Sequence, residues 1–400
     1  MELSNGVRYQ AFAPLRNSIN AVYRTVISIG TSTIVATKRT SPLIVVAAST
    51  LGLGAIFFRR WVSKKRAENK VVFCKCKSRL NDKVVVITGA TSGIGYQVAL
   101  MSAQQQATVI FGARDPENGR AIAEQIRRKS SNRRVHCLYL DLTDFQSCKR
   151  FCDKVREMEP VIDFLVNNAG VLNQTPARTK DGFEKTWQTN FLSCIIITEN
   201  LLGSVGVGVS EHAGIIFVSS ATRLMVNPSD VANVEQMRDV PEITTFEEGI
   251  GHYALTKMAL WMYAAYTAYS RKNRKDIFVA SVDPGSVWTG LFRDSWKDLS
   301  GLYTRLMCML CLRTPAEGAQ TIMHCMNCPK IRNGVLLKDC QEIGFLPEDA
   351  IELSPEFVSK SYKLISKYLP ADCKAVDEIK ISPDLSFEES PENETKVTCY

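Results

Sequence analysis

The feature that most constrains the fold of this chain is the segment KVVVITGATSGIG at residues 83–95. A run of apolar β-branched residues leads there into a turn that contains Gly89, Gly93 and Gly95. Glycines at such a turn let the backbone approach a phosphate without interference from side chains, and the N-terminus of the following helix attracts the same anion. The segment predicts a strand–turn–helix unit that binds the pyrophosphate of a dinucleotide. A glycine-rich turn without a ligand is the competing interpretation.

Strand-like and helix-like segments alternate along the chain after residue 83. Each run rich in β-branched and aromatic residues is followed by a longer amphipathic or polar stretch. This alternation is typical of the Rossmann fold, an α/β architecture with a doubly wound parallel sheet, and we expect one such domain. The expected strands are Val84–Thr88, Thr108–Gly112, His136–Leu140, Phe164–Asn168, Gly214–Ser219 and Ile277–Val282.

The formal net charge of +8 is confined to the N-terminal part of the 400 residues. Residues 1–70 carry 11 Lys or Arg against two acids, so residues 71–400 sum to about −1. The folded part is therefore not a basic nucleic-acid binder, and we expect no nucleic-acid partner.

An uncharged run of 17 residues, PLIVVAASTLGLGAIFF at 42–58, ends at Arg59-Arg60. Its length is at the short limit for a membrane-spanning helix, and the basic residues after it place that side in the cytosol. We expect a single-pass protein of the endoplasmic reticulum with a cytosolic catalytic domain and with membrane lipid as a partner. Because residues 3–67 contain no acid, a mitochondrial address and membrane are the alternative.

The expected organisation has five parts. A basic leader at 1–41 precedes the membrane segment at 42–58, and a basic linker at 59–80 leads into the Rossmann-fold domain at 81–370. The remaining residues, 371–400, form an acidic tail rich in Asp, Glu, Ser and Pro, which is typical of disorder.

The 13 cysteines are odd in number and scattered through apolar stretches, which favours reduced thiols over disulfides. Cys308-x-x-Cys311 and Cys325-x-x-Cys328 come close to zinc-ribbon spacing. However, the LMCMLCL stretch around the first pair has no turn residues and is typical of a buried helix. We therefore expect no metal ligands.

Polar residues follow several of the expected strands, where the chemistry of such a sheet lies. Arg114 stands after the second strand, where an acid would bind a ribose 2′-hydroxyl, and a guanidinium suits a 2′-phosphate. This favours NADP(H) over NAD(H). Asp141-Leu142 after the third strand would meet the adenine, and Asn167-Asn168-Ala169-Gly170 after the fourth would let the cofactor lie against the backbone.

Tyr253 and Lys257 are the acid–base candidates. Four residues apart on a predicted helix, they lie on one face, where the ammonium would stabilise a phenolate and lower the pKa of Tyr253. A Tyr-x-x-x-Lys pair is expected by chance in a chain of this composition. Its position is informative, because it follows the fifth strand by one loop and that strand ends in Ser219-Ser220.

Together these segments resemble the classical short-chain dehydrogenase/reductase family from about residue 82 to 324. The resemblance to the retinol-dehydrogenase-like branch rests on GARDPENG, on the DGFE motif at 181–184 and on RTPAEGAQ at 313–320. The motifs that carry the family resemblance, in the family's order, are TGATSGIG at 88–95, Asp141-Leu142, NNAG at 167–170, Asn190, Ser219-Ser220, YALTK at 253–257 and PGSVWT at 284–289.

The resemblance implies a catalytic set of Asn190, Ser220, Tyr253 and Lys257. Tyr253 would exchange a proton with the alcohol or carbonyl oxygen, and Ser220, rather than Ser219, would hold the same oxygen. Lys257 would bind the nicotinamide ribose, and Asn190 would support a water relay to Lys257.

The resemblance also implies the cofactor contacts. Residues 284–289 would hold the nicotinamide carboxamide, chiefly through the backbone of Val287. The expected cofactor-binding residues are Gly89, Ser92, Gly93, Ile94, Gly95, Arg114, Asp141, Leu142, Asn168, Tyr253, Lys257, Pro284, Val287 and Thr289.

Two features depart from the family pattern. The branch usually has Ser where this chain has Thr256, and 33 residues separate Ser220 from Tyr253, more than in compact members. We interpret residues 223–250 as a substrate lid, with a surface insertion without function as the alternative. The apolar residues of this lid would be Met225, Val226, Val231, Met237 and Phe246.

The expected function is a membrane-anchored, NADP(H)-dependent oxidoreductase that interconverts a hydrophobic alcohol and its aldehyde or ketone, such as a retinoid, steroid or lipid carbonyl. One alternative is a cofactor-binding scaffold or sensor without turnover. Another is a thiol-metal protein built on the two Cys pairs. The expected partners are a hydrophobic small molecule and membrane lipid, with a homo-oligomer left open.

Overall fold

The computed structural model describes residues 71–76, 79–172, 175–207, 212–243, 245–270, 276–290 and 312–374, together with residues 60, 63, 64 and 274. The expected leader and the expected membrane segment at 42–58 lie outside these residues. The chain divides into two compact units, 1–70 and 71–400, and the fold below is that of the second. Within the described ranges, none of the helices combines the length and the apolar character that crossing a membrane requires.

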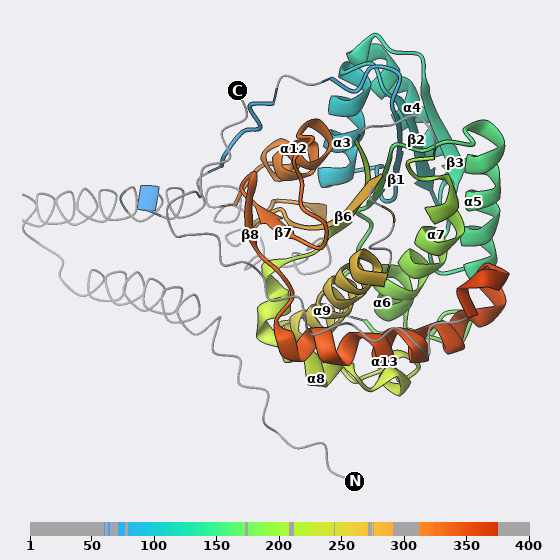
Figure 1. The fold of residues 1–400 in the computed structure, drawn as a ribbon, viewed down its shortest axis with the longest axis vertical. Coiled ribbons are helices and arrows are strands. Elements are labelled where there is room, and N and C mark those ends of the chain that lie inside the picture. Colours follow the sequence, from blue (N-terminus) through green and yellow to red (C-terminus); the bar gives the residue numbers. More distant parts are fainter. Residues whose placement is uncertain are drawn as a thin grey trace, which may run out of the picture. The chain divides into compact units, whose positions relative to one another are not determined.

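The domain is built on one eight-stranded sheet with the order β3-β2-β1-β4-β5-β6-β7-β8 (Figure 1). Neighbouring strands from β3 to β7 run parallel, and β8 is antiparallel to β7. The strands are β1 Val84–Ile87, β2 Thr108–Ala113, β3 Val135–Tyr139, β4 Phe164–Asn167, β5 Ala213–Val218, β6 Ile277–Asp283, β7 Leu336–Lys338 and β8 Gln341–Gly344.

Helices connect the strands. The α-helices are α3 Gly93–Gln104, α4 Pro116–Ser130, α5 Phe145–Met158, α6 Lys185–Trp187, α7 Ser193–Leu201, α8 Pro228–Val231, α9 Phe246–Ser270, α11 Pro315–Gly318, α12 Gln320–Asn327 and α13 Glu348–Ile365. A π-helical turn, η2 Gln188–Leu192, lies between α6 and α7. The 3-10 turns are η3 Leu202–Ser204, η4 Ala221–Met225, η5 Val234–Met237, η7 Ser366–Tyr368 and η8 Ala371–Lys374.

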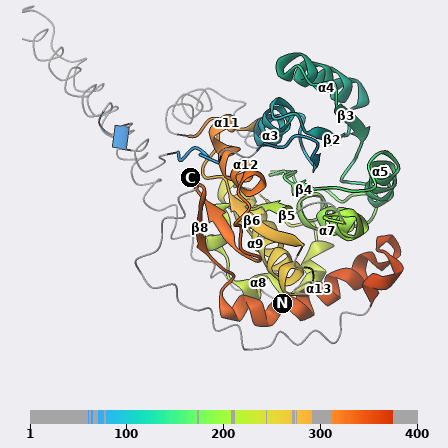
Figure 2. The same ribbon diagram turned by 45° about the horizontal axis from the view of Figure 1, so that its top comes forward.

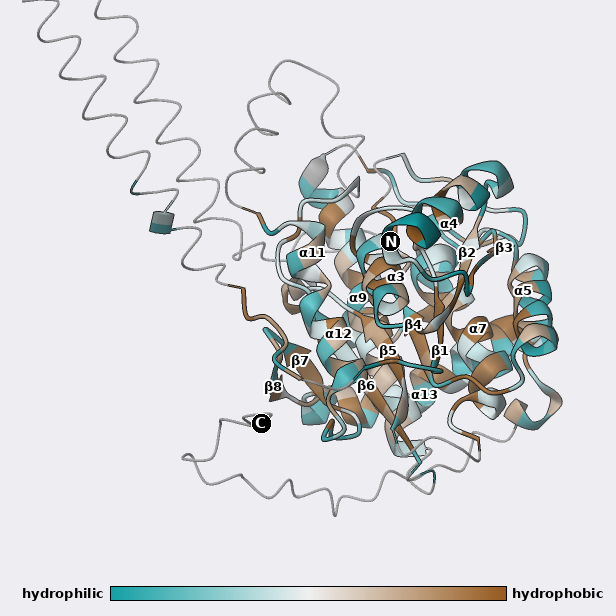
Figure 3. Cartoon of the chain, turned by 90° about the horizontal axis from the view of Figure 1, so that it is seen from above, coloured by the Kyte–Doolittle hydropathy of each residue, from teal (hydrophilic) through white to brown (hydrophobic). Residues whose placement is uncertain are grey.

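Helices cover both faces of the sheet, as the alternation of side chains along β1 shows. Val84 and Val86 belong to a hydrophobic core that includes residues of α5, α7, α9 and α13. Val85 and Ile87 belong to a second core with residues of α3, α4 and α12. Figures 1 and 2 show the two sets of helices on opposite sides of the sheet. In Figure 3 the strands are hydrophobic at the centre, while α4 is largely hydrophilic. The Rossmann architecture predicted from the sequence is confirmed.

Each of the six expected strands lies within one residue of its predicted bounds. The sequence analysis missed β7 and β8, which are short and include the polar residues Lys338, Gln341 and Glu342. Strands this short give little periodicity to detect, and they lie at the sheet edge, where β7 pairs with β6 and β8 pairs with β7. The strand β8 adds an antiparallel edge to the predicted parallel sheet.

The C-terminal part of the fold continues through Lys374, beyond the expected boundary at 370. Cys373 in η8 is buried, and its Sγ donates to Glu199 Oε2 at 3.1 Å. The remaining tail lies outside the described residues.

The segment from 223 to 250 packs into the domain rather than over it. Val231 in α8 and Met237 in η5 are fully buried in the core shared with α9 and α13. The backbone N–H of Glu184 also donates to Met237 O at 2.8 Å. Val231 and Met237, two of the apolar residues of the expected lid, therefore contribute to this core.

No disulfide joins any of the cysteines within the described residues. Cys325 and Cys328 are buried, and the other expected pair, Cys308 and Cys311, lies outside the described residues.

Candidate active site

The turn after β1 has a backbone that only glycine suits. Gly89 and Gly93 adopt φ values of +70° and +59°, in the left-handed region. A Cβ on Gly95 would lie 2.4 Å from both Gly89 O and Asn168 Nδ2. The Asn168 amide supports the turn, because its Nδ2 donates to Thr88 O at 2.9 Å and to Gly89 O at 3.1 Å. The turn is thus held close to α3 with no side chain in between.

The start of α3 suits an anion such as a pyrophosphate. Its first turn carries no acidic residue, and the N-cap residue Ser92 makes no side-chain capping bond. The N–H groups of that turn have no partner within the helix, and the helix dipole favours negative charge there. Together with the glycine backbone, this arrangement fits the phosphates of a dinucleotide.

The segment at 284–289 lies next to this turn, although some 190 residues separate the two in the chain. A Cβ on Gly93 would lie 3.3 Å from Thr289 Cγ2. Val287 pairs with Arg313 in a short parallel bridge, and Arg313 Nη1 donates to Pro284 O at 3.2 Å. The RTPAEGAQ motif therefore holds the expected nicotinamide-binding segment in place through its first residue.

Gly318 of the same motif allows α11 to pack closely against two expected cofactor-binding residues. A Cβ there would lie 2.7 Å from Val287 and 3.2 Å from Ile94 Cγ1. Both of these residues are expected to contact the cofactor, and the missing side chain lets α11 pack against them.

Three other expected cofactor residues follow the strands as predicted. Arg114 is exposed directly after β2. Asp141 Oδ1 accepts from Thr143 N at 2.9 Å and from Thr143 Oγ1 at 2.7 Å, which fixes its carboxylate. Leu142 is partly buried, and its carbonyl accepts from Ser193 Oγ at 2.6 Å.

Asn190 lies in the π-helical turn η2, a geometry that is frequent at functional sites. Its Oδ1 accepts from Val171 N at 2.8 Å, and its Nδ2 donates to Val171 O at 2.9 Å and to Thr256 Oγ1 at 3.1 Å. A Cβ on Gly170 would lie 3.4 Å from Lys257 Nζ and 3.7 Å from Asn190 Oδ1. Asn190 therefore joins the loop after β4 to α9 and lies beside the lysine.

Tyr253 and Lys257 occupy one face of α9 and are 7% and 2% exposed. The Lys257 Nζ lies 5.5 Å from the centroid of the Tyr253 ring and donates to Val218 O at 2.8 Å. Burial of the ammonium lowers the pKa of Lys257 to about 8.

The pKa of Tyr253 moves in the direction opposite to the one predicted. Burial raises it most, the charge of Asp283 raises it further, and a hydrogen bond with Ser220 lowers it only in part. The predicted lowering by Lys257 is wrong in this structure, because desolvation of the phenolate dominates. The protonated phenol is the stable form at neutral pH.

The structure distinguishes the two serines after β5. Ser219 Oγ donates to the backbone carbonyl of Lys257 at 3.4 Å, and Ser219 is only 2% exposed. Ser220 caps η4, where its Oγ accepts from Thr222 N at 3.2 Å, and it hydrogen-bonds with Tyr253. Ser220 is thus the serine joined to the phenol.

Sequence reasoning missed an ion pair beside these residues. Arg223 Nη1 lies 3.3 Å from Asp283 Oδ2 and donates to Ser220 O at 2.8 Å. Asp283 ends β6 directly before the Pro-Gly of the nicotinamide-binding motif, a position that could have drawn attention to it.

A second missed pair involves the residue before Tyr253. His252 Nε2 lies 2.9 Å from Glu184 Oε2, and Glu184 also accepts from Thr186 N and Trp187 N at the start of α6. Burial would raise the pKa of Glu184, but the hydrogen bond from His252 and those from the helix outweigh it and lower the pKa. The DGFE motif therefore anchors the beginning of α9.

Comparisons with known proteins show the family of this chain. Residues 83–232 match the model of the short chain dehydrogenase family. Retinol dehydrogenase 12 from Bos taurus is 31% identical over 279 residues, covering 68% of this chain and 83% of that protein. Polyprenol dehydrogenase from Mus musculus is 30% identical over 262 residues, covering 64% and 76%.

A solved structure of an uncharacterized protein from Mycobacterium Paratuberculosis has the same fold. It has a TM-score of 0.55 at 22% identity and covers 73% of this chain and 97% of that chain. This chain belongs to the short-chain dehydrogenase/reductase family, in its retinol-dehydrogenase-like branch. It is an oxidoreductase that acts on CH–OH groups with a nicotinamide cofactor, and the resemblance predicted from its motifs is confirmed.

Proposed function

We propose that this protein is a membrane-anchored, NADP(H)-dependent oxidoreductase that interconverts a hydrophobic alcohol with its aldehyde or ketone. The observation that carries the proposal is the buried pair of Tyr253 and Lys257 on α9, with Ser220 hydrogen-bonded to the phenol. Asn190 is joined to the same helix through Thr256.

The roles of these side chains follow from their protonation and contacts. When bound, the nicotinamide exchanges a hydride with the substrate carbon. The Tyr253 phenol holds a proton at neutral pH, as an ordinary tyrosine does, and can donate it to a carbonyl oxygen. Ser220 holds the same oxygen by a hydrogen bond.

We infer that Lys257 binds the nicotinamide ribose. An ammonium has three N–H donors, and Val218 O is its one hydrogen-bond acceptor within the described part of the chain. The other two donors are available for ribose hydroxyls. Asn190 would then support the water relay to this lysine.

The choice of NADP(H) rests on the end of β2. Arg114 is exposed there and suits a 2′-phosphate. The neighbouring acid, Asp115, would favour NAD(H), but its carboxylate caps α4 by accepting from Glu117 N at 3.0 Å and Asn118 N at 3.2 Å. The carboxylate is thus engaged with the helix rather than with a ribose.

The substrate class rests on the relatives and on the expected anchor. The names of the two relatives, retinol dehydrogenase and polyprenol dehydrogenase, refer to long apolar alcohols. An anchor at 42–58 would bring the domain to the membrane in which such molecules dissolve. We place the protein in the endoplasmic reticulum, with a mitochondrial membrane as the alternative.

The decisive experiment measures NADPH oxidation by the detergent-solubilised full chain with retinal, keto-steroids, long-chain aldehydes and a polyprenal. We expect at least one substrate to be reduced about 10²-fold faster or more than by a Tyr253→Phe variant. The variant should still bind NADPH. If no substrate distinguishes the two proteins although both bind NADPH, the chain would act as a cofactor-binding scaffold instead.

The anchor has its own test. Membranes from cells that express the full chain are extracted with alkaline carbonate, beside a variant that lacks residues 1–70. The full chain should stay in the pellet, and release of both proteins would contradict the anchor.

A further inference from the structure

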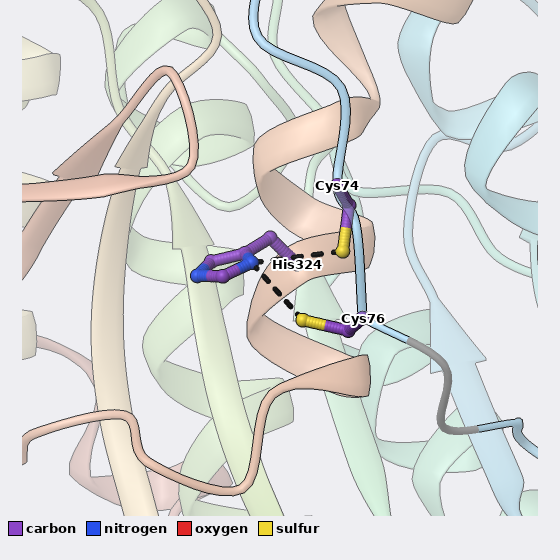
Figure 4. Close-up of side chains that lie close together, drawn as sticks. All are labelled: Cys74, Cys76 and His324. Carbon is purple, nitrogen blue, oxygen red and sulfur yellow. Dashed lines mark hydrogen bonds between the residues drawn. The ribbon is translucent and has the colours of Figure 1, made fainter. Parts of the chain in front are cut away.

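Two cysteines and a histidine meet on the α12 side of the sheet, the face opposite α9 and its Tyr253. Cys74 and Cys76 come from the extended segment 71–76, and His324 comes from α12 (Figure 4). The Cys74 Sγ lies 3.6 Å from His324 Nδ1, and the Cys76 Sγ lies 3.5 Å from the same nitrogen. The three ligand atoms all lie within 4.8 Å of one another.

Local geometry explains why these side chains converge. In an extended segment, alternate residues point to the same side. Cys74 and Cys76 are half-buried. Phe73, which precedes them, and Lys75, which lies between them, are exposed. The inward side of the segment therefore presents two thiols to α12.

The helix holds this segment at two points one turn apart. Gln320 and His324 are four residues apart on α12 and lie on one face. Gln320 Oε1 accepts from Cys74 N at 3.4 Å, which fixes the height of the segment along the helix. The imidazole of His324, only 8% exposed, presents its Nδ1 to both sulfurs, which lie on the same side of the ring.

Hydrogen bonding alone does not account for the arrangement. The Nδ1 atom of a neutral imidazole has either one hydrogen or one lone pair, so it can make one good hydrogen bond. Here two sulfurs approach it at nearly the same distance. A cation bound by all three atoms would account for the approach of both sulfurs to Nδ1.

The two distances from Nδ1 to the sulfurs match those of a tetrahedral zinc site. Zinc–sulfur bonds of about 2.3 Å and zinc–nitrogen bonds of about 2.0–2.1 Å place a sulfur and a nitrogen ligand of a tetrahedral site about 3.6 Å apart. The observed separations between Nδ1 and the sulfurs are 3.5 and 3.6 Å. Two sulfurs and one imidazole also form a soft donor set, which favours binding of zinc over binding of magnesium or calcium.

We propose that Cys74, Cys76 and His324 bind a zinc ion through two thiolates and Nδ1. Each thiol releases its proton to solvent on binding, so that two negative charges offset the charge of Zn²⁺. A water molecule or another donor completes the tetrahedron. None of these ligands belongs to the Cys-x-x-Cys pairs considered from the sequence.

The zinc ion would fasten the first residues of the compact unit 71–400 to α12. The segment 71–76 has no regular secondary structure of its own. A metal crosslink between residues 76 and 324 closes a long loop and so stabilises the folded domain.

The test uses the full chain, purified under reducing, metal-free conditions and titrated with Co²⁺ as a spectroscopic probe. We expect saturation at one cobalt per chain, with a thiolate-to-cobalt charge-transfer band and the intense visible bands of tetrahedral cobalt. Zn²⁺ should displace the cobalt and raise the Tm by a few degrees. A folded wild-type chain without the charge-transfer band would overturn the proposal, whatever the variants do.

Variants locate the site. The double variant Cys74→Ser/Cys76→Ser and the single variant His324→Ala should lose the one-to-one cobalt spectrum and the zinc-dependent rise in Tm. The matched control is Cys137→Ser on β3, which should retain both. Survival of the charge-transfer band in the double variant would assign it to other cysteines and overturn the proposal.

Discussion

Arg223 and Asp283 form an ion pair in the interior of the domain, with side chains 4% and 2% exposed. Arg223 also donates to Ser220 O at 2.8 Å, and its guanidinium lies 4.8 Å from the ring centroid of Trp261 on α9. Asp283 Oδ1 accepts from Gly285 N at 2.9 Å. The pair thus connects η4, α9 and the end of β6, the elements that carry the candidate serine, the candidate tyrosine and the nicotinamide-binding segment.

Replacing Arg223 by Leu should destabilise the protein strongly. The change leaves Asp283 charged and buried without its partner, which costs about 3–5 kcal/mol of unfolding free energy. Urea denaturation measures the loss. The double variant Arg223→Leu/Asp283→Asn should recover part of it, because the uncompensated charge is then gone.

An exposed ion pair provides the comparison. Lys360 and Glu356 lie one turn apart on α13, with side chains 47% and 71% exposed. Lys360→Met should change the stability far less than Arg223→Leu, because water and salt screen an exposed pair. If Arg223→Leu and Lys360→Met lose equal stability, the interior ion pair does not stabilise the fold more than an exposed one.

The stability of the cofactor-free protein should rise with pH because of Lys257. Its pKa is about 8 in the folded chain, against 10.5 as the ordinary value. Between these two pH values the unfolded chain binds more protons than the folded one, so folding becomes more favourable as the pH increases. From pH 7.5 to 9.5 this contribution amounts to about 2 kcal/mol.

The measurement compares wild type with Lys257→Met by urea denaturation at several pH values in that window. Other titrating groups are common to both proteins and cancel in the difference. The stability of the wild type relative to the variant should grow with pH. A constant difference would show that the ammonium is not desolvated in the folded protein.

Gly95→Ala should damage the phosphate-binding turn. The added methyl group would lie 2.4 Å from Gly89 O, a backbone atom that cannot move aside. We expect a loss of about 1–3 kcal/mol in stability and weaker binding of the dinucleotide. Thermal unfolding and NADPH titration measure the two effects.

Gly203→Ala is the matched control, because a Cβ at that position meets nothing within 4 Å. It should leave both stability and NADPH affinity nearly unchanged. Equal effects of the two substitutions would mean that the close approach at Gly95 is unimportant.

Arg114→Ala should weaken the binding of NADPH about 10-fold or more and leave NADH binding nearly unchanged. The guanidinium would lose a charge-assisted hydrogen bond to a phosphate that NADH lacks. Dissociation constants for both cofactors measure the change. Arg128→Ala, at an exposed position near the end of α4, should affect neither cofactor. Parallel losses for both cofactors in Arg114→Ala would refute the assignment.

The sequence by itself determined the sheet from β1 to β6 and the glycine turn, because these depend on local patterns. A buried strand such as β5 needs a continuous apolar run, and the turn after β1 needs glycine at defined positions. The same local spacing placed Tyr253 and Lys257 on one helix face. The strands β7 and β8 are too short to give that signal, and they pair at the sheet edge, β7 with β6 and β8 with β7.

Only the tertiary structure decided how the side chains of the site behave. The raised pKa of Tyr253 results from burial and from Asp283, which lies 30 residues further along the chain. Likewise, Cys74 and Cys76 meet His324 only because α12 packs against the segment 71–76. The pKa of a buried group and the distances between metal ligands both depend on which residues lie together in the low-dielectric interior. Packing, and not spacing along the chain, determines which residues those are.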